Sequence, residues 1–267
     1  MSVADAPPTV VSCLMVTADR PHLCKRALLS YQAQTYPHKE LVVLDNGTRP
    51  MDELLGTLPS DEVHYMRVEP HPDLVIGALR NLSLEAATGP YVAPQWDDDD
   101  WSHPDRLTQQ VAMLEAGFDA CTLPATLMHV DDPTYFDHPF VGQLPNGVPP
   151  TIVHRRDAEI RYPPLRRTSD TAYVNAWRDL RYAILPADTT HHYIRYFHGG
   201  NLWEQEHFLR RMRNTAFDLL AYGWYHYVRR DVRLHPRFQL SPEARAGFEL
   251  YLEHSRQVGL FANHPTA

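Results

Sequence analysis

Apolar runs of strand length alternate with amphipathic stretches over the first half of the chain, and this order limits the fold more than any other sequence feature. Buried strands are predicted for four runs rich in apolar residues, at 9–18, 39–47, 63–68 and 91–96. Helices are predicted where apolar residues recur at a spacing of three or four, at 23–34, 73–89 and 103–117. Strands that alternate with helices predict an α/β fold with a mostly parallel sheet and helices on both of its faces.

Beyond Cys121 the pattern becomes less regular. The segment 131–168 is rich in proline, and we expect irregular structure there with one strand over 151–155. The remaining predicted elements are a helix over 169–180 with Ser169 as its N-cap, a strand over 191–198, a long helix over 201–220 and a last helix over 241–257.

The composition of the 267-residue chain, 43% apolar and 22% charged, is that of an ordinary globular protein. Its formal net charge of −8 argues against broad binding to nucleic acid. The three cysteines, Cys13, Cys24 and Cys121, lack metal-type spacing, which suggests a reducing compartment. We find neither a targeting signal at the N-terminus nor an apolar run of membrane-spanning length, so a cytoplasmic protein is expected, with peripheral membrane contact left open.

Polar residues follow three of the predicted strands. Thr17, Asp45 and Asp97 each stand at the carboxyl end of a strand. In open α/β sheets ligands bind in the crevice outside these ends. We therefore expect the three side chains to converge on one crevice.

Four consecutive aspartates, Asp97 to Asp100, follow the fourth predicted strand and lie between Trp96 and Trp101. Adjacent carboxylates repel one another, and tryptophans are usually partly buried, so the run needs a positive partner. Mg²⁺ or Mn²⁺ is a suitable one, because these ions take carboxylate oxygens and keep positions open for phosphate. Asp97 and Asp99 can face one crevice, with Asp98 and Asp100 directed elsewhere. The alternative is a solvated acidic loop.

The first 110 residues resemble family 2 glycosyltransferases of the GT-A fold. The resemblance lies in four pieces in the usual order: "VSCLMVTADRP", "KELVVLDNGT", "IGALRNLSLEAATGPYVAPQWDDDDW" and "HPDRL". It implies a Rossmann-like, mostly parallel sheet with a helical C-terminal extension. It also implies a domain over 1–200, with a donor half at 1–110 and an acceptor half at 111–200, and an extension over 201–267 packed on it.

The resemblance also implies roles for the residues that match the motifs. Thr17 and Asp45 would contact the nucleoside, and Arg80 the base or the phosphates. Asp97 would face the ribose and the metal, with Asp98 beside it among the donor-binding residues, and Asp99 would bind the metal. Two departures leave base recognition open, because Asp19 replaces the usual asparagine and "DNGT" stands where "DDGS" is common. Taken alone, Thr17 and Asp45 can be turn residues, and Arg80 a surface ion-pair partner.

In the second half, the family's catalytic base commonly lies in a Glu-Asp pair at the start of a helix. Here Ser169 takes the place of the glutamate and Asp170 that of the aspartate, so the resemblance implies Asp170 as the general base. Its alternative role is favourable interaction with the helix dipole. His198, in "RYFHGGNLW", would be a third metal ligand or a hydrogen-bond donor to the diphosphate; a packed or surface histidine is the alternative.

Basic and aromatic residues cluster between 201 and 230, where the sequence says least about function. We expect the arginines to lie on solvated helix faces, and Trp224 and Tyr227 to pack in the core. The stretch "AYGWYHYVRR" can alternatively form a platform for an acceptor sugar or touch a membrane surface.

The function predicted from these features is a metal-dependent, inverting hexosyltransferase. It would move a sugar from a nucleotide diphosphate sugar, with UDP-sugar favoured, to the hydroxyl of a glycan, a lipid-linked or a small-molecule acceptor. A homo-oligomer is compatible with the sequence. One alternative is a nucleotidyltransferase that forms sugar nucleotides, but "MVTADRPHLCKR" lacks its glycine-rich phosphate loop. Another is an inactive protein that binds nucleotide or carbohydrate on the same fold.

Overall fold

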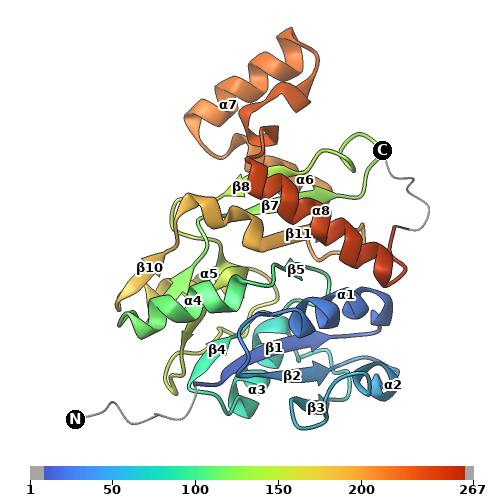
Figure 1. Cartoon of the computed structure of the whole chain (residues 1–267), viewed down its shortest axis with the longest axis vertical. Helices are drawn as coiled ribbons and strands as arrows, with labels where there is room; N and C mark the ends of the chain where they lie inside the picture. Colours follow the sequence, from blue (N-terminus) through green and yellow to red (C-terminus); the bar gives the residue numbers. More distant parts are fainter. Residues whose placement is uncertain (1–8, 262–267) are drawn as a thin grey trace.

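Two β-sheets organise the chain, which the computed structural model describes over residues 9–261 (Figure 1). The larger sheet has the strand order β10 (Tyr182–Ile184), β6 (Ala120–Thr122), β9 (Val153–Arg155), β4 (Tyr91–Ala93), β1 (Val11–Thr17), β2 (Lys39–Asp45), β3 (Val63–Arg67). Only β9 runs antiparallel to its neighbours, so the expected mostly parallel sheet is confirmed. Residues 1–8, in which no targeting signal is predicted, lie outside the described range.

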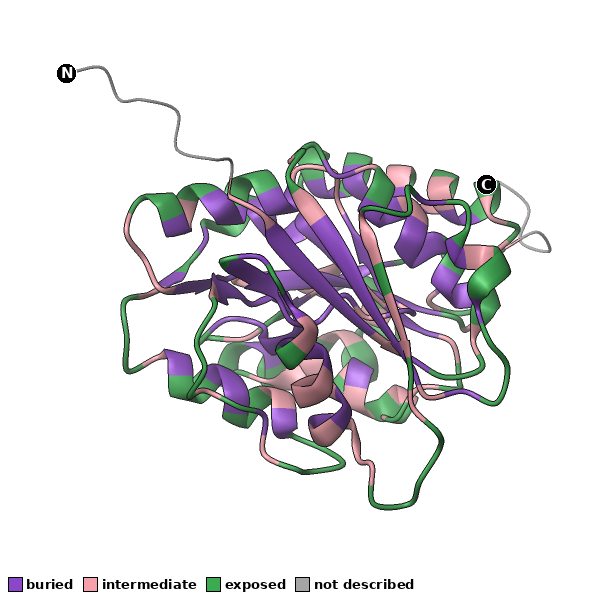
Figure 2. Cartoon of the chain, turned by 90° about the horizontal axis from the view of Figure 1, so that it is seen from below, coloured by how far each residue is buried: buried purple, intermediate pink, exposed green. Residues whose placement is uncertain are grey.

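Helices cover both faces of the larger sheet, and alternation along β1 explains why. Cys13 and Met15 point to the side of α1 (Pro21–Gln32) and α4 (Arg106–Glu115), whereas Leu14 points to the side of α3 (Ile76–Ala86) and α5 (Ser169–Trp177). Because strand side chains alternate between faces, the largely apolar sequence of β1 serves two cores. Figure 2 shows the buried strands between the two helical layers.

The second sheet, in the order β5 (Trp101–Ser102), β11 (Tyr193–Phe197), β7 (Ala125–Val130), β8 (Phe140–Gln143), adjoins the first. The C-terminal helix α8 (Pro242–Gln257) packs Phe248 and Tyr251 against it. This helix begins as its Ser-Pro-Glu start predicts, since the Ser241 hydroxyl accepts a hydrogen bond from the Ala244 amide at 3.2 Å. On the other side of the sheet lies α6 (Gln205–Leu209).

Several predicted elements are wrong. The helix expected over 201–220 is divided into α6, a 3₁₀ turn η3 (Arg210–Arg213) and α7 (Ala216–Gly223). The division occurs because the Thr215 hydroxyl caps a new helix by accepting from the Asp218 amide. Ser169 is the first residue of α5 rather than its N-cap; Thr168 holds that position with a left-handed φ of 63°.

The segment 131–168 is more ordered than expected. It contains β8 as well as the predicted strand at β9, and the four residues of β8 are too few to show a period in the sequence. The expectation that Trp224 and Tyr227 pack in the core is wrong, because their side chains are 54% and 74% exposed. Within residues 9–261, no helix is both long and apolar enough to span a bilayer.

Candidate active site

The aspartate run forms a loop that is held at both ends and in the middle. The indole nitrogen of Trp96 donates to the carbonyl of Ala27 at 3.0 Å, and that of Trp101 donates to His254 Nδ1 at 3.1 Å. Between them, the buried Arg26 guanidinium donates to the carbonyl of Asp99 at 2.5 Å and to the Tyr251 hydroxyl at 2.9 Å. Helices α1 and α8 together therefore fix the backbone from which the four carboxylates project.

Each of the four aspartates lies near an arginine. The N–O distances are 3.5 Å for Arg80–Asp97, 2.6 Å for Arg20–Asp98, 3.1 Å for Arg20–Asp99 and 3.9 Å for Arg195–Asp100. These guanidinium groups offset much of the repulsion that an acidic run would otherwise suffer. The protein itself thus supplies the positive partners that the run requires. A metal ion would bind in addition to these arginines.

The four carboxylates divide into two that reach solvent and two that are packed. Asp97 and Asp99 are 28% and 15% exposed, against 1% and 7% for Asp98 and Asp100. Asp98 accepts a hydrogen bond from the Thr17 hydroxyl at 2.6 Å, and Asp100 accepts from the Tyr196 amide at 2.9 Å. All four aspartates line one cleft, contrary to the expectation that Asp98 and Asp100 are directed elsewhere, but Asp97 and Asp99 are the two whose carboxylates are more accessible from it.

The Asp99 carboxylate is the most heavily bonded of the four. Its Oδ2 atom lies 3.1 Å from Arg20, 3.2 Å from the Asn201 amide nitrogen and 3.3 Å from His198 Nε2. Burial alone would raise the pKa of this carboxyl, but the hydrogen bond to His198 and the charge of Arg20 lower it below its ordinary value. Asp99 is therefore the aspartate best suited to carry a full negative charge.

The pKa values of the two packed aspartates shift in the opposite direction to that of Asp99. Burial, followed by the negative charge of Asp99, raises the pKa of Asp98 to about 7 and that of Asp100 to about 8. In the unfolded chain an aspartate titrates near pH 3.9. Between these values the native state holds protons that the unfolded state has released, so the stability of the protein falls as pH rises through this window.

We expect Asp100→Asn to reduce this pH dependence. The substitution keeps the acceptor for the Tyr196 amide and removes the titrating group. From roughly pH 6 to pH 9, the free energy of unfolding of the variant should therefore rise by about 1–3 kcal/mol relative to that of the wild type. Chemical denaturation in a metal chelator at both pH values measures it. Asp73→Asn, at a 91% exposed carboxylate, is the matched control. If wild type and Asp100→Asn differed in free energy of unfolding by the same amount at both pH values, the raised pKa of Asp100 would be contradicted.

A cleft of about 290 Å³ opens at this loop and collects most of the predicted site residues. Asp97 to Asp100, Arg80 and Asp170 all line it. Asp170 lies in the first turn of α5, half-buried, and its Oδ1 accepts a hydrogen bond from the Thr171 amide at 2.8 Å. Its negative charge contributes to raising the pKa of Asp97, after burial and the charge of Asp99. The cleft therefore places two groups of carboxylates on different elements.

Thr17 and Asp45 stand opposite each other at the ends of β1 and β2, as predicted from the strand ends, but neither lines the cleft. Thr17 is bonded to Asp98 as described. Asp45 is fully buried and accepts from the Gly47 amide at 2.8 Å and from the Tyr65 hydroxyl at 2.7 Å. In this structure both residues support the rim of the sheet.

Several residues of the cleft were not predicted from the sequence. Arg20 and Asn201 contact Asp99 directly, and Arg166, Arg167 and Trp203 line the same space. Arg20 had a signal, because it closes the first motif, "TADR". Asn201 follows the "HGG" segment, in which Gly199 has a φ of 80°, and its amide also donates to the Tyr196 carbonyl at 3.0 Å. That turn returns the chain to Asp99.

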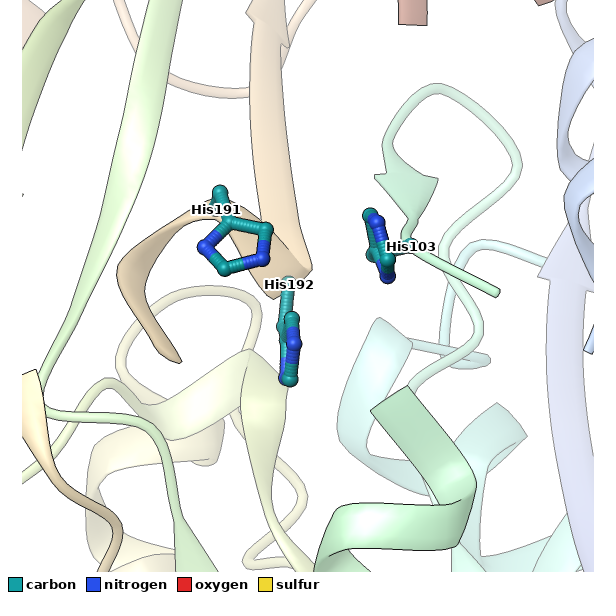
Figure 3. A group of neighbouring side chains, drawn as sticks. All are labelled: His103, His191 and His192. Carbon is teal, nitrogen blue, oxygen red and sulfur yellow. The ribbon is translucent and has the colours of Figure 1, made fainter. Parts of the chain in front are cut away.

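Three imidazoles, His103, His191 and His192, form a separate group (Figure 3). One ring nitrogen from each lies within 4.8 Å of those of the other two. His103 stacks on His192 with centroids 5.1 Å apart. Burial lowers the pKa of His103 to about 4 and that of His192 to about 3, so both rings are neutral. Neutral imidazoles suit zinc, whereas Mg²⁺ and Mn²⁺ prefer oxygen. The group does not line the cleft.

The loop of Asp97 to Asp100, which we name the acid loop, has the donor atoms that suit a hard divalent cation. Asp97 and Asp99 offer carboxylate oxygens at the cleft surface, with His198 beside Asp99. Such ions keep ligand positions for phosphate oxygens, and the cleft leaves space for them.

Comparison with known proteins identifies the family of the chain. The family described as Glycosyl transferase family 2 matches residues 12–166, which is more than half of the chain. The chain therefore belongs to glycosyl transferase family 2 and is a glycosyltransferase. No curated protein matches it significantly.

Solved structures show the same fold at low sequence identity. Residues 1–349 of TarS from S. aureus, in complex with UDP-GlcNAc, are 17% identical with a TM-score of 0.59, and the match covers 93% of this chain and 81% of that one. The mannosyltransferase PcManGT from Pyrobaculum calidifontis, in complex with GDP-Man and Mn²⁺, is 17% identical with a TM-score of 0.53, covering 98% and 77%. The expected GT-A fold is thus confirmed.

Proposed function

We propose that the protein transfers a hexosyl group from a nucleotide diphosphate sugar, with UDP-sugar favoured, to an acceptor hydroxyl, with inversion and with a divalent metal ion. One observation carries the proposal: Asp97 to Asp100, Arg80 and Asp170 line a single cleft at the carboxyl end of the sheet. Membership of glycosyl transferase family 2 supports the reaction class. The similar structures in complex with UDP-GlcNAc and with GDP-Man support the donor class.

The donor would enter the cleft between Arg80 and the acid loop. Arg80 is only 12% exposed and is already oriented by Asp97, so it can meet the base or a phosphate with little loss of side-chain entropy. Thr17 and Asp98, which are bonded to each other, would position Arg20 beside the diphosphate. Asp45 would shape the adjacent rim of the sheet for the nucleoside.

The metal ion would be held by Asp97 and Asp99, with His198 as a third ligand. When bound, Mn²⁺ or Mg²⁺ would neutralise the charge that develops on the departing diphosphate. Arg20, His198 and Asn201 all contact Oδ2 of Asp99, so the other oxygen of this carboxylate would be available to the ion. The complex of PcManGT with Mn²⁺ supports a divalent ion in this fold.

Asp170 would act as the general base. It lines the cleft on α5, whereas the acid loop follows β4, so an acceptor between them would have its hydroxyl near Asp170 and its target carbon near the diphosphate. A base that takes the hydroxyl proton during a single displacement gives inversion at the anomeric carbon. No second carboxylate is assigned as a nucleophile.

A screen of nucleotide sugars for thermal stabilisation, with and without Mn²⁺, tests this proposal. A ligand that binds only the native state raises the apparent stability by mass action. We expect UDP-sugars with Mn²⁺ to raise the melting temperature, and other nucleotides to do so less. No stabilisation by any nucleotide diphosphate sugar would contradict the assigned function.

A further inference from the structure

Large apolar side chains gather on the surface of α7 and the adjoining π-helical turn η4 (Trp224–Val228). Among the described residues, six of the eleven large apolar side chains with high exposure lie within the twelve positions 217–228. They are Phe217, Leu219, Leu220, Trp224, Tyr227 and Val228, with exposures from 54% to 76%. Scattered exposed apolar residues are ordinary, but a contiguous group marks an interaction site.

Four of these residues form one stripe, which we name the apolar ridge: Phe217, Leu220, Trp224 and Tyr227. Their spacing of three, four and three places them on the same side of the helical segment. The ridge lies on residues 216–237, which we name the hairpin. This segment stands away from the body of the molecule at one end of its long axis, at the top of Figure 1.

A buried ion pair anchors this segment. Asp218 is 4% exposed and pairs with Arg237 through two hydrogen bonds of 2.7 and 3.0 Å. The carbonyl of Asp218 lies 3.2 Å from Nε2 of the buried His235. A buried ion pair beside exposed aromatic rings reverses the usual distribution of a folded surface, and the pair holds the start of α7 in place.

The charge around the ridge is opposite in sign to that of the whole chain. Residues 205–237 contain seven arginines and three acidic residues, so they carry a net charge of +4, whereas the chain carries −8. Arg229 and Arg230 directly follow η4 and are exposed. A ridge of Trp, Tyr, Leu and Phe flanked by arginines is the composition that binds the interface of an anionic membrane.

We propose that this hairpin docks the protein on anionic lipid membranes, with the apolar ridge inserted at the level of the lipid headgroups and the arginines paired with lipid phosphates. A second copy of the chain fits less well. In a two-fold dimer through this ridge, the same arginines would face one another and repel. A projecting tip also matches the penetrable surface of a bilayer better than the flat surface of a dimer.

The hairpin is connected to the cleft by a short stretch of chain. Phe208 of α6 lines the cleft, and η3 leads from it directly to α7. Docking of the hairpin would therefore hold the cleft near the membrane surface and favour acceptors located there. The docking itself depends neither on the donor nor on the metal.

Co-sedimentation with vesicles tests the proposal without donor or metal. We expect the wild type to bind vesicles that contain phosphatidylglycerol, to bind pure phosphatidylcholine less, and to dissociate as salt is added. Leu220→Ser/Trp224→Ser should weaken binding at least tenfold. Arg229→Gln/Arg230→Gln should remove the preference for anionic vesicles. All four positions are exposed, so folding should be retained, which circular dichroism checks.

Leu180→Ser/Ile184→Ser, which removes exposed apolar side chains outside the hairpin, is the matched control and should bind as the wild type does. Absence of wild-type binding to both vesicle types would overturn the proposal, and so would equal binding by the Leu220→Ser/Trp224→Ser variant. A wild-type dimer in light scattering that this variant converts to monomer, without vesicle binding, would assign the ridge to self-association instead. A protein that docks on vesicles without transferring sugar would contradict only the proposed function.

Discussion

Asp170→Asn is expected to lower the rate of sugar transfer by about 10²–10⁴-fold and to leave donor binding unchanged. This is the range in which removal of a positioned general base acts. The amide keeps the shape of the side chain and an acceptor for the Thr171 amide, but it cannot take a proton. Transfer from the nucleotide sugar under single-turnover conditions, together with donor affinity by calorimetry, separates the two effects.

The other role of Asp170 is to stabilise the start of α5. Loss of one carboxylate in a first helical turn costs about 0.3–1 kcal/mol through the helix dipole, which would change stability without abolishing transfer. Asp179→Asn, an exposed carboxylate beyond the same helix, is the control for a general loss of charge. Normal transfer by Asp170→Asn would move the base to another residue.

Asp99→Asn is expected to remove the metal-dependent part of nucleotide binding. Groups that merely support a metal ligand cost about 10–100-fold in metal affinity when mutated, so loss of a direct ligand should cost at least as much. In a chelator, UDP should bind the variant as well as it binds the wild type or slightly better, because one negative charge facing the diphosphate is gone. Calorimetry with and without Mn²⁺ gives both values.

His191→Ala serves as a second comparison, because it alters the imidazole group of Figure 3 without touching the cleft. It should retain the Mn²⁺ dependence of UDP binding. If His191→Ala lost that dependence and Asp99→Asn kept it, the metal ion would belong to the imidazole group, and the assignment to the acid loop would be wrong.

The sequence predicted β1 to β4 and β9 of the central sheet, but it missed the three-residue strands β6 and β10. β1 and β2 are buried on both faces, and parallel strands of that kind are conspicuous in a sequence. The second sheet was not predicted as a sheet, since its strands come from distant parts of the chain, and β5 has only two residues. Such pairings depend on tertiary contacts, which leave no local period.

The sequence predicted the acidic residues of the candidate site better than its basic residues. The aspartate run and Asp170 were recognised from their motifs, and the structure brings them into one cleft. Arg26 gave no signal, because it occupies a helical position where an exposed arginine is ordinary, yet it is fully buried beneath the loop. The role of α8, which supplies Tyr251 to the same network, likewise follows only from the folded structure.

The central claim is that the acid loop holds a divalent ion that in turn binds a nucleotide diphosphate. Because Arg20 already pairs with Asp98 and Asp99, a purely protein-based phosphate site is a real competitor to the metal site. Titration of the wild type with UDP by calorimetry, in Mn²⁺ and in a chelator, distinguishes them most directly. We predict binding that is tight in Mn²⁺ and at least about tenfold weaker without it, a difference of about 1.4 kcal/mol. Equal affinity in both conditions would contradict the claim.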